Sequence, residues 1–140
     1  AEDGIRDYKV TGSSDVCSSD LETKKILSNE IEVVATCARV PVFVSHSEAI
    51  TVEFDEPIDV EQAVEAWHET DGIILLDRPE DAGYATPKDA AGDNAVFVSR
   101  VRQDPSVPYG LTFWCVSDNL RKGAAWNAVQ IAQALAEDYL

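Results

Sequence analysis

The sequence predicts an α+β domain built on a mixed, mainly antiparallel β-sheet with helices on one face. Three observations lead to this fold class. Short β-prone runs recur along the chain, two segments carry the 3.6-residue period of an amphipathic helix, and strands and helices do not alternate regularly as in βαβ folds. A chain of 140 residues suits one domain with a modest core, because a chain of this size buries about 68–70% of its unfolded surface.

The first elements are expected between residues 22 and 54. ETKKIL (Glu22–Leu27) is typical of the last turns of a helix whose beginning is missing. Ile31–Ala35 and Val40–Val44 are short β-prone runs, the second interrupted by Pro41. Ala49–Phe54 alternates between apolar and polar side chains, which indicates a half-buried strand.

A helix is expected next, opening at residues 57–59. Asp59 is the N-cap, because its carboxylate can accept from the first backbone N–H groups, and Gln62 stands three residues on, as in a capping box. The apolar stripe of this helix consists of Ala63, Val64 and Trp67. Ile73–Leu76 then returns as a strand.

The last part of the chain is expected to hold a long loop, two strands and a helix. Residues 78–94 contain Pro79, Gly83, Pro87 and Gly92. They predict a loop, and loops of that length are often functional. Ala95–Arg102 and Leu111–Val116 are two further strands. A long helix begins at about Asn119, and its apolar stripe consists of Leu120, Ala124, Ala128, Ile131 and Leu135.

The charge balance argues against some classes of partner. The chain has 26 acidic and 11 basic residues, a net charge of −15, which disfavours nucleic acid and anionic membranes. The apolar runs are as short as Ile73–Leu76, so no transmembrane helix is expected. No secretory signal is expected, and the few cysteines predict reduced thiols in a cytoplasmic protein.

Residues Ala1–Leu21 differ from the rest of the chain. They are rich in Asp, Ser and Gly and follow neither a helical nor a strand period, as in a disordered tail. AEDGIRD, the variable pair Tyr8-Lys9, VTG and SSDVCSSDL resemble the translation of a sequencing-library adapter. We therefore interpret residues 1–21 as a non-native leader and expect one native domain over residues 22–140. Because the chain contains no methionine, we expect it to be a fragment.

One segment places a guanidinium and an imidazole among apolar residues. These are Arg39 and His46. A lone histidine on such a segment is more often structural than catalytic, and an arginine on a strand is usually an edge charge. Seven residues of straight strand would separate them by about 23 Å and point them to opposite faces. They can serve one small ligand only if the chain bends between them, at Pro41 or at Ser45-His46-Ser47.

Four collinear stretches resemble the aspartate-semialdehyde dehydrogenase family. They are ETKKIL (22–27), ATCARVPVFVSHSEA (35–49), ATPKDAAGDNAVFVSRVRQD (85–104) and GLTFWCVSDNLRKGAAWNAVQIAQ (110–133). The resemblance spans residues 22 to about 135, at the family's spacing. It implies the C-terminal catalytic and dimerisation domain shared by semialdehyde and glyceraldehyde-3-phosphate dehydrogenases.

The resemblance implies an NADPH-dependent reduction of L-aspartyl 4-phosphate to L-aspartate 4-semialdehyde, with release of phosphate. This step belongs to lysine (diaminopimelate), threonine and methionine biosynthesis. By motif, Arg39 would bind the substrate α-carboxylate through its bidentate guanidinium. His46 would be the general acid/base, because an imidazole exchanges protons near neutral pH. Asn119 would approach the nicotinamide end of NADP. The resemblance implies a homodimer and no metal.

The chain also departs from the family pattern. Ser45 stands where relatives often carry Gly before the catalytic histidine, and Trp126 is bulkier than expected. The family's nucleophilic cysteine and glycine-rich dinucleotide turn would precede Glu22, so the fragment alone is expected to be inactive. Cys37 and Cys115, among apolar neighbours, are expected to be buried structural thiols. Two alternatives stay open: an N-acetyl-γ-glutamyl-phosphate reductase-like enzyme, and a non-catalytic acidic dimerisation or interaction domain.

Overall fold

The computed structural model describes residues 22–81 and 83–139. The chain divides into two units between residues 41 and 42. In the described part of the first unit, residues 22–26 form a helix, and the Leu27 N–H donates to the Thr23 carbonyl at 2.9 Å. The helical character predicted for residues 22–27 is confirmed. The expected leader, residues 1–21, lies outside the described residues.

Two predicted strands are wrong. Residues 27–45 contain neither helix nor strand, so Ile31–Ala35 and Val40–Val44 do not pair with any strand in the described part of the chain. Val34 is 95% exposed. A β-prone run becomes a strand only where a neighbouring strand takes up its N–H and C=O groups, and Pro41 has no N–H to offer.

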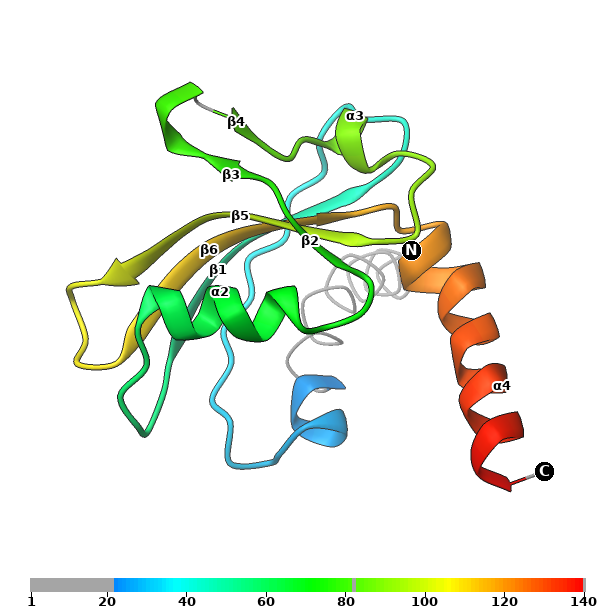
Figure 1. Cartoon of the computed structure of the whole chain (residues 1–140), viewed down its shortest axis with the longest axis horizontal. Helices are drawn as coiled ribbons and strands as arrows, with labels where there is room; N and C mark the ends of the chain where they lie inside the picture. The colour runs from blue at the N-terminus through cyan, green and yellow to red at the C-terminus, as the bar shows by residue number, and fades with distance from the viewer. Residues whose placement is uncertain (1–21, 82, 140) are drawn as a thin grey trace, which may run out of the picture. The chain divides into compact units, whose positions relative to one another are not determined.

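The second unit is built on a four-stranded sheet in the order β1-β6-β5-β2 (Figure 1). Its strands are β1 (His46–Glu53), β2 (Ile73–Leu75), β5 (Val96–Asp104) and β6 (Gly110–Ser117). β6 is antiparallel to β1 and to β5, whereas β2 is parallel to β5. The predicted mixed, mainly antiparallel sheet is therefore confirmed. The alternation read at 49–54 corresponds to β1, which begins earlier, at His46.

Helix α2 (Val60–His68) packs against β2 and β5 on one face of the sheet. The ring of Trp67, in its predicted apolar stripe, meets Phe113 edge to face with centroids 4.9 Å apart. The start of the helix is capped as predicted. The Asp59 carboxylate accepts from the Gln62 N–H at 2.8 Å, and Gln62 Oε1 accepts from the Asp59 N–H at 3.0 Å.

The opposite face carries short elements that the sequence analysis treated as one loop. They are β3 (Asp77–Arg78), a 3-10 turn (Pro79–Asp81), β4 (Gly83–Tyr84) and α3 (Pro87–Ala90). In Figure 1 they lie above the strands, with α2 below. Trp114 Nε1 donates to the Ala85 carbonyl at 2.9 Å on this side, while its neighbour Phe113 faces α2, since successive strand residues point to opposite faces.

The core of the second unit is small. One cluster consists of Ala85, Ala90, Ala95, Phe97 and Val116, with Leu76 and Trp114 packed against it, and Ala63, Val98 and Leu111 are buried as well. Three of the five buried members are alanines, so α3 and the segment after it approach the sheet closely. The expectation of an uninterrupted loop at residues 78–94 is wrong for this reason: the segment folds onto the sheet and contributes to its core.

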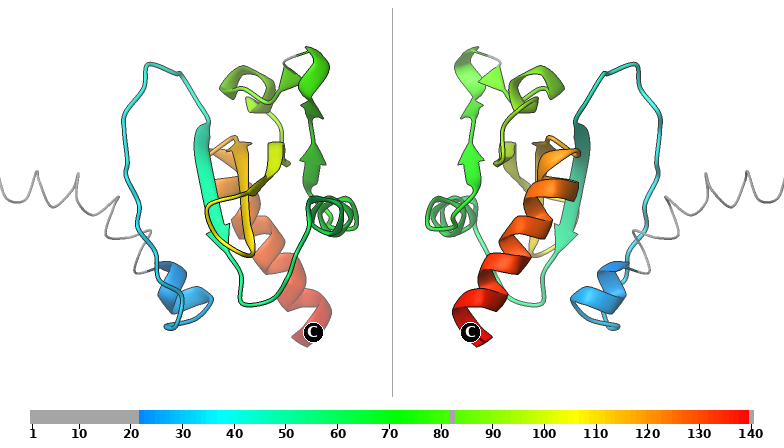
Figure 2. Two further views of the ribbon diagram at one scale, coloured as in Figure 1. Left: turned by 90° about the vertical axis from the view of Figure 1, so that its left-hand side faces the viewer. Right: turned by 90° about the vertical axis from the view of Figure 1, so that its right-hand side faces the viewer.

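The chain leaves β6 through a π-helical turn, η2 (Arg121–Ala125), and continues as α4 (Trp126–Tyr139). In η2 the Ala125 N–H donates to the Leu120 carbonyl, five residues back, at 3.3 Å. The predicted terminal helix is confirmed, with this π turn at its start. Figure 2 shows α4 running away from the end of β6, and its stripe is exposed, with Ile131 at 55% and Leu135 at 53%. Among the described residues, no helix is long and apolar enough to cross a membrane.

Candidate functional site

The sheet brings two of the predicted site residues to the same end. β1 begins at His46, which pairs with Ser117, the last residue of β6. Asn119 follows that strand after one residue, Asp118. The Ser45 N–H donates to Asn119 Oδ1 at 2.8 Å, a contact between residues 74 positions apart. His46 and Asn119 therefore lie on neighbouring segments joined by one hydrogen bond.

Ser45 has a left-handed backbone, with φ at 86°. A side chain disfavours this region, which glycine adopts freely. Besides the contact of its N–H, the Ser45 hydroxyl donates to the Pro87 carbonyl at the start of α3, at 2.9 Å. The departure noted before the predicted catalytic histidine thus falls on a position whose conformation suits glycine.

His46 has a carboxylate partner that the sequence analysis did not single out. His46 Nε2 and Glu48 Oε1 lie 2.7 Å apart, and the two side chains are 62% and 49% exposed. Residues two apart on a strand share a face. The proximity of Glu48 to His46 could therefore have been predicted if the strand had been expected to begin at His46. A carboxylate in this position can fix the ring orientation of an imidazole that exchanges protons.

Asp118 is a second residue that the sequence analysis missed. Only 4% of it is exposed, and its carboxylate accepts from the N–H groups of Gly92 at 2.8 Å and Leu120 at 2.9 Å. The Gly92 hydrogen bond, followed by those of Leu120 and Arg121, holds the pKa of Asp118 below its ordinary value of 3.8. The sequence signal is its place between a strand and a helix, where Asp commonly accepts from backbone N–H groups.

Arg39 belongs to the first unit, in a stretch without helix or strand, and it is exposed. The chain bends at residues 41, 43 and 44 and turns left-handed at Ser45. The segment between residues 41 and 45 is therefore not a straight strand. That the two side chains serve one ligand stays a prediction.

The two described cysteines differ. Burial, together with the nearby charge of Glu48, raises the pKa of Cys115 to about 11, so its thiol is protonated near neutral pH. Cys37 is exposed, so the prediction that it is buried is wrong, because the segment that contains it has no strand or helix. Among the described residues no three His, Cys, Asp or Glu side chains cluster as a metal site would require.

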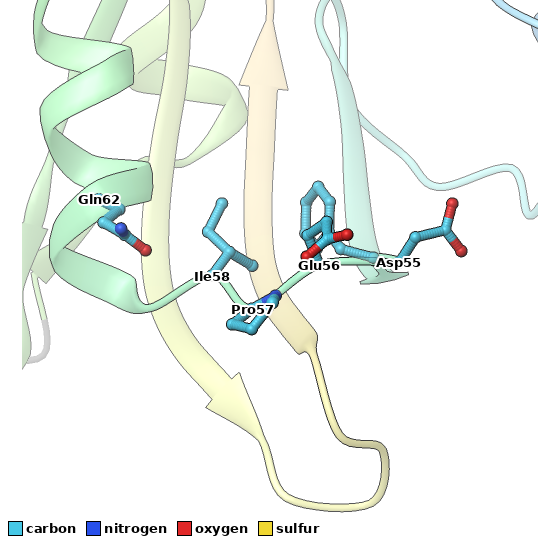
Figure 3. A pocket seen from close by; sticks show the side chains of 6 residues that line it. Asp55, Glu56, Pro57, Ile58 and Gln62 are labelled. Atoms are coloured by element: carbon cyan, nitrogen blue, oxygen red, sulfur yellow. The ribbon is translucent and has the colours of Figure 1, made fainter.

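A surface pocket of about 480 Å³ lies elsewhere, in the connection from β1 to α2 (Figure 3). It is lined by Phe54, Asp55, Glu56, Pro57, Ile58 and Gln62. These residues follow the last residue of β1, whereas His46 is the first. The pocket is therefore separate from the site formed around His46 and Asn119.

Comparison with known proteins gives consistent results. Residues 14–122 match the family model described as "Semialdehyde dehydrogenase, dimerisation domain". The chain is 41% identical to the aspartate-semialdehyde dehydrogenase of Rickettsia bellii and 47% identical to that of Aquifex aeolicus, covering 86% and 85% of this chain. It spans 36% and 35% of the length of those relatives.

A solved structure gives the same picture. The crystal structure of aspartate semialdehyde dehydrogenase II from Vibrio cholerae, complexed with ASA, superposes with a TM-score of 0.83 and 46% identity. The match covers 89% of this chain and 37% of that one. The similarity therefore extends over nearly the whole of this chain and over little more than a third of the protein it resembles.

Proposed function

This chain belongs to the semialdehyde dehydrogenase family, and from that premise we propose that it is the C-terminal catalytic and dimerisation part of an aspartate-semialdehyde dehydrogenase. The reaction proposed for the whole enzyme is the NADPH-dependent reduction of L-aspartyl 4-phosphate to L-aspartate 4-semialdehyde and phosphate. The observation that carries the proposal is the hydrogen bond from Ser45 to Asn119. It joins the two motifs that the reaction would need at one site, the proton-transfer residue and the cofactor-facing residue.

His46 is the proposed general acid/base. Its imidazole is exposed at the start of β1 and lies 2.7 Å from the carboxylate of Glu48. In the proposed reaction it would take the proton from the attacking thiol and return a proton as the thioester is reduced and the carbon–sulfur bond breaks. The thiol itself is proposed to come from the part of the enzyme that this chain does not include. Cys115, with its raised pKa, is not a suitable nucleophile.

Arg39 is proposed to bind the substrate α-carboxylate. A guanidinium forms two parallel hydrogen bonds with a carboxylate, a geometry that lysine cannot reproduce. Arg39 is an exposed residue.

Asn119 is proposed to contact the nicotinamide end of NADP, which supplies the hydride when bound. The residue fits this role because it is exposed and its Oδ1 is already occupied by the Ser45 N–H. Its Nδ2 then has two hydrogens to donate, as a carboxamide oxygen requires. The rest of the dinucleotide is proposed to bind a glycine-rich turn in the other domain.

A second copy of this chain is the proposed macromolecular partner. The family model that matches is described as a dimerisation domain. The described residues include more exposed large apolar side chains, such as Phe43 and Leu135, than the scattered few that are normal on a monomer surface. Light scattering of the 140-residue chain should give a mass above that of the monomer, and a monomer at high concentration would contradict the homodimer.

The decisive experiment restores the upstream coding sequence and assays the full-length enzyme. NADP reduction should depend on aspartate semialdehyde and phosphate together, in the reverse direction. N-acetylglutamate semialdehyde should not replace the substrate, and the 140-residue chain alone should be inactive. Turnover of the acetylated substrate would favour the reductase-like alternative. An inactive full-length protein that still dimerises would favour the non-catalytic interaction domain.

A further inference from the structure

The direction of His46 is set by the residue before it. Ser45 has φ at 86°, a conformation that places its side chain too close to its own backbone. Such a conformation persists in a non-glycine residue only where surrounding contacts hold it. Any residue that holds Ser45 therefore also holds the strand start at His46.

Two hydrogen bonds hold Ser45, and they come from different parts of the chain. Asn119 Oδ1 accepts from the Ser45 N–H at 2.8 Å, which fixes the peptide plane entering Ser45. The Pro87 carbonyl accepts from the Ser45 hydroxyl at 2.9 Å, which fixes the side chain. The first contact acts on the backbone, so it bears most directly on the path of the chain into His46.

Asn119 is itself fixed by its neighbours. The buried Asp118 carboxylate accepts from the N–H groups of Gly92 and Leu120. The Asp118 carbonyl accepts from the N–H groups of Arg121 and Lys122, at 3.1 and 2.9 Å. The turn after β6 is thus tied at both sides of Asn119, and its side chain extends from a rigid support.

The orientation of the Asn119 amide follows from chemistry. A backbone N–H can only donate, so the atom of Asn119 that meets Ser45 must be the oxygen. Replacing this side chain by aspartate would keep an acceptor for Ser45 but remove the Nδ2 donor. Replacing it by alanine would remove both. The two functions of one amide can therefore be separated by substitution.

We propose that Asn119 is a positioning residue for His46, which acts by holding the Ser45 peptide through Oδ1. This inference rests on the proposed function and deepens it: the residue assigned to the cofactor also sets the direction of the proton-transfer residue. Hydride transfer and proton transfer at the site then depend on the same side chain through two different atoms.

The first test is amide hydrogen exchange by NMR on the 140-residue chain, which needs no enzymatic activity. In Asn119→Ala the Ser45 N–H should exchange at least about tenfold faster, because its acceptor is gone. In Asn119→Asp it should stay as slow as in the wild type. Asn127→Ala, an exposed amide on α4, is the matched control and should leave Ser45 unchanged. Unchanged exchange in a well-dispersed spectrum of Asn119→Ala overturns the proposal.

The second test measures kinetics in the full-length enzyme. Asn119→Asp should raise KM for NADP with a smaller effect on kcat. Asn119→Ala should also lower kcat, by up to about 10²-fold, as misplacement of a catalytic group can. Equal kcat values for the two variants would overturn the positioning role. If Asn119→Ala does not fold, the test is the exchange rate of the Ser45 N–H in Asn119→Asp. Exchange faster than in the wild type would then overturn the proposal. An inactive wild type would refute the proposed function, while the exchange experiment would still decide whether Asn119 holds Ser45.

Discussion

Substitutions at Ser45 should separate backbone strain from hydrogen bonding. Ser45→Ala removes the hydroxyl that donates to Pro87, a loss of about 0.5–1.5 kcal/mol, and keeps the left-handed strain. Ser45→Gly loses the same hydrogen bond but relieves about 1–2 kcal/mol of strain. The greater conformational freedom of glycine in the unfolded chain reduces this gain in stability by about 0.5–1 kcal/mol. The glycine variant should therefore be the more stable of the two, by about 0–1.5 kcal/mol.

Urea unfolding followed by tryptophan fluorescence measures this difference. A central value of about 0.7 kcal/mol corresponds to a midpoint shift of about 0.2–0.7 M, for a denaturant slope of about 1–3 kcal/mol/M. Ser47→Ala is the matched control, since the buried Ser47 hydroxyl makes no hydrogen bond within the described residues. Its removal should leave stability unchanged or slightly raised. A glycine variant less stable than the alanine variant would refute the claim that Ser45 is strained.

Four further predictions concern the site and the fold. In the full-length enzyme, Arg39→Lys should raise KM for the substrate strongly, whereas His46→Asn should lower kcat by about 10²–10⁴-fold. Steady-state kinetics measures both effects. Wild-type values of KM and kcat in these variants would contradict the site assignment. Because the folded pKa of Asp118 lies below 3.8, its stabilising effect is present above that pH and is lost as the pH falls through the folded pKa. Thermal melts at several pH values should show the wild type losing its advantage over Asp118→Asn in acid. The Cys115 thiol should react with a thiol reagent only slowly near neutral pH, since its pKa is about 11. Deleting residues 1–21 should leave the thermal midpoint within error; a fall of several degrees would show that they contribute to the fold.

The parts of the fold that depend on local chemistry could be predicted. The capping box of Asp59 and Gln62 is complete within four residues, so its sequence suffices to place the start of α2. The alternation around Ile50 and Val52 likewise reports one half-buried face of β1.

The failed strands had the right residues but depended on distant partners. Ile31–Ala35 and Val40–Val44 have β-prone residues, yet propensity cannot say whether a neighbouring strand is present to bind them. In residues 78–94 the glycines and prolines indicated turns. Two very short strands and α3 could not be predicted there, because elements of two to four residues are too short to show a periodic pattern of apolar residues.

The candidate site shows the same division. Arg39, His46 and Asn119 are proposed as site residues because each stands in a motif of a known family. The contact of Ser45 with Asn119 spans 74 positions, and the left-handed backbone of Ser45 arises from the packing around it. The short distance from Glu48 to His46 and the burial of Asp118 depend on the folded structure, and the residue types alone do not reveal them.

The π turn η2 has a consequence for the phase of the terminal helix. Its hydrogen bonds span five residues instead of four, so the turn holds one residue more than an α-helix needs. Removing a single residue there, such as Gly123, would let the turn close as α-helix. Everything beyond it would then keep nearly its present direction, because the wider π turn accommodates the extra residue within about the same rotation and rise as an α-helix one residue shorter. If all the residues of η2 closed as α-helix instead, the stripe of Ile131 and Leu135 would rotate by about 100°. The π turn, and not the sequence of α4 alone, therefore sets the direction in which that stripe faces.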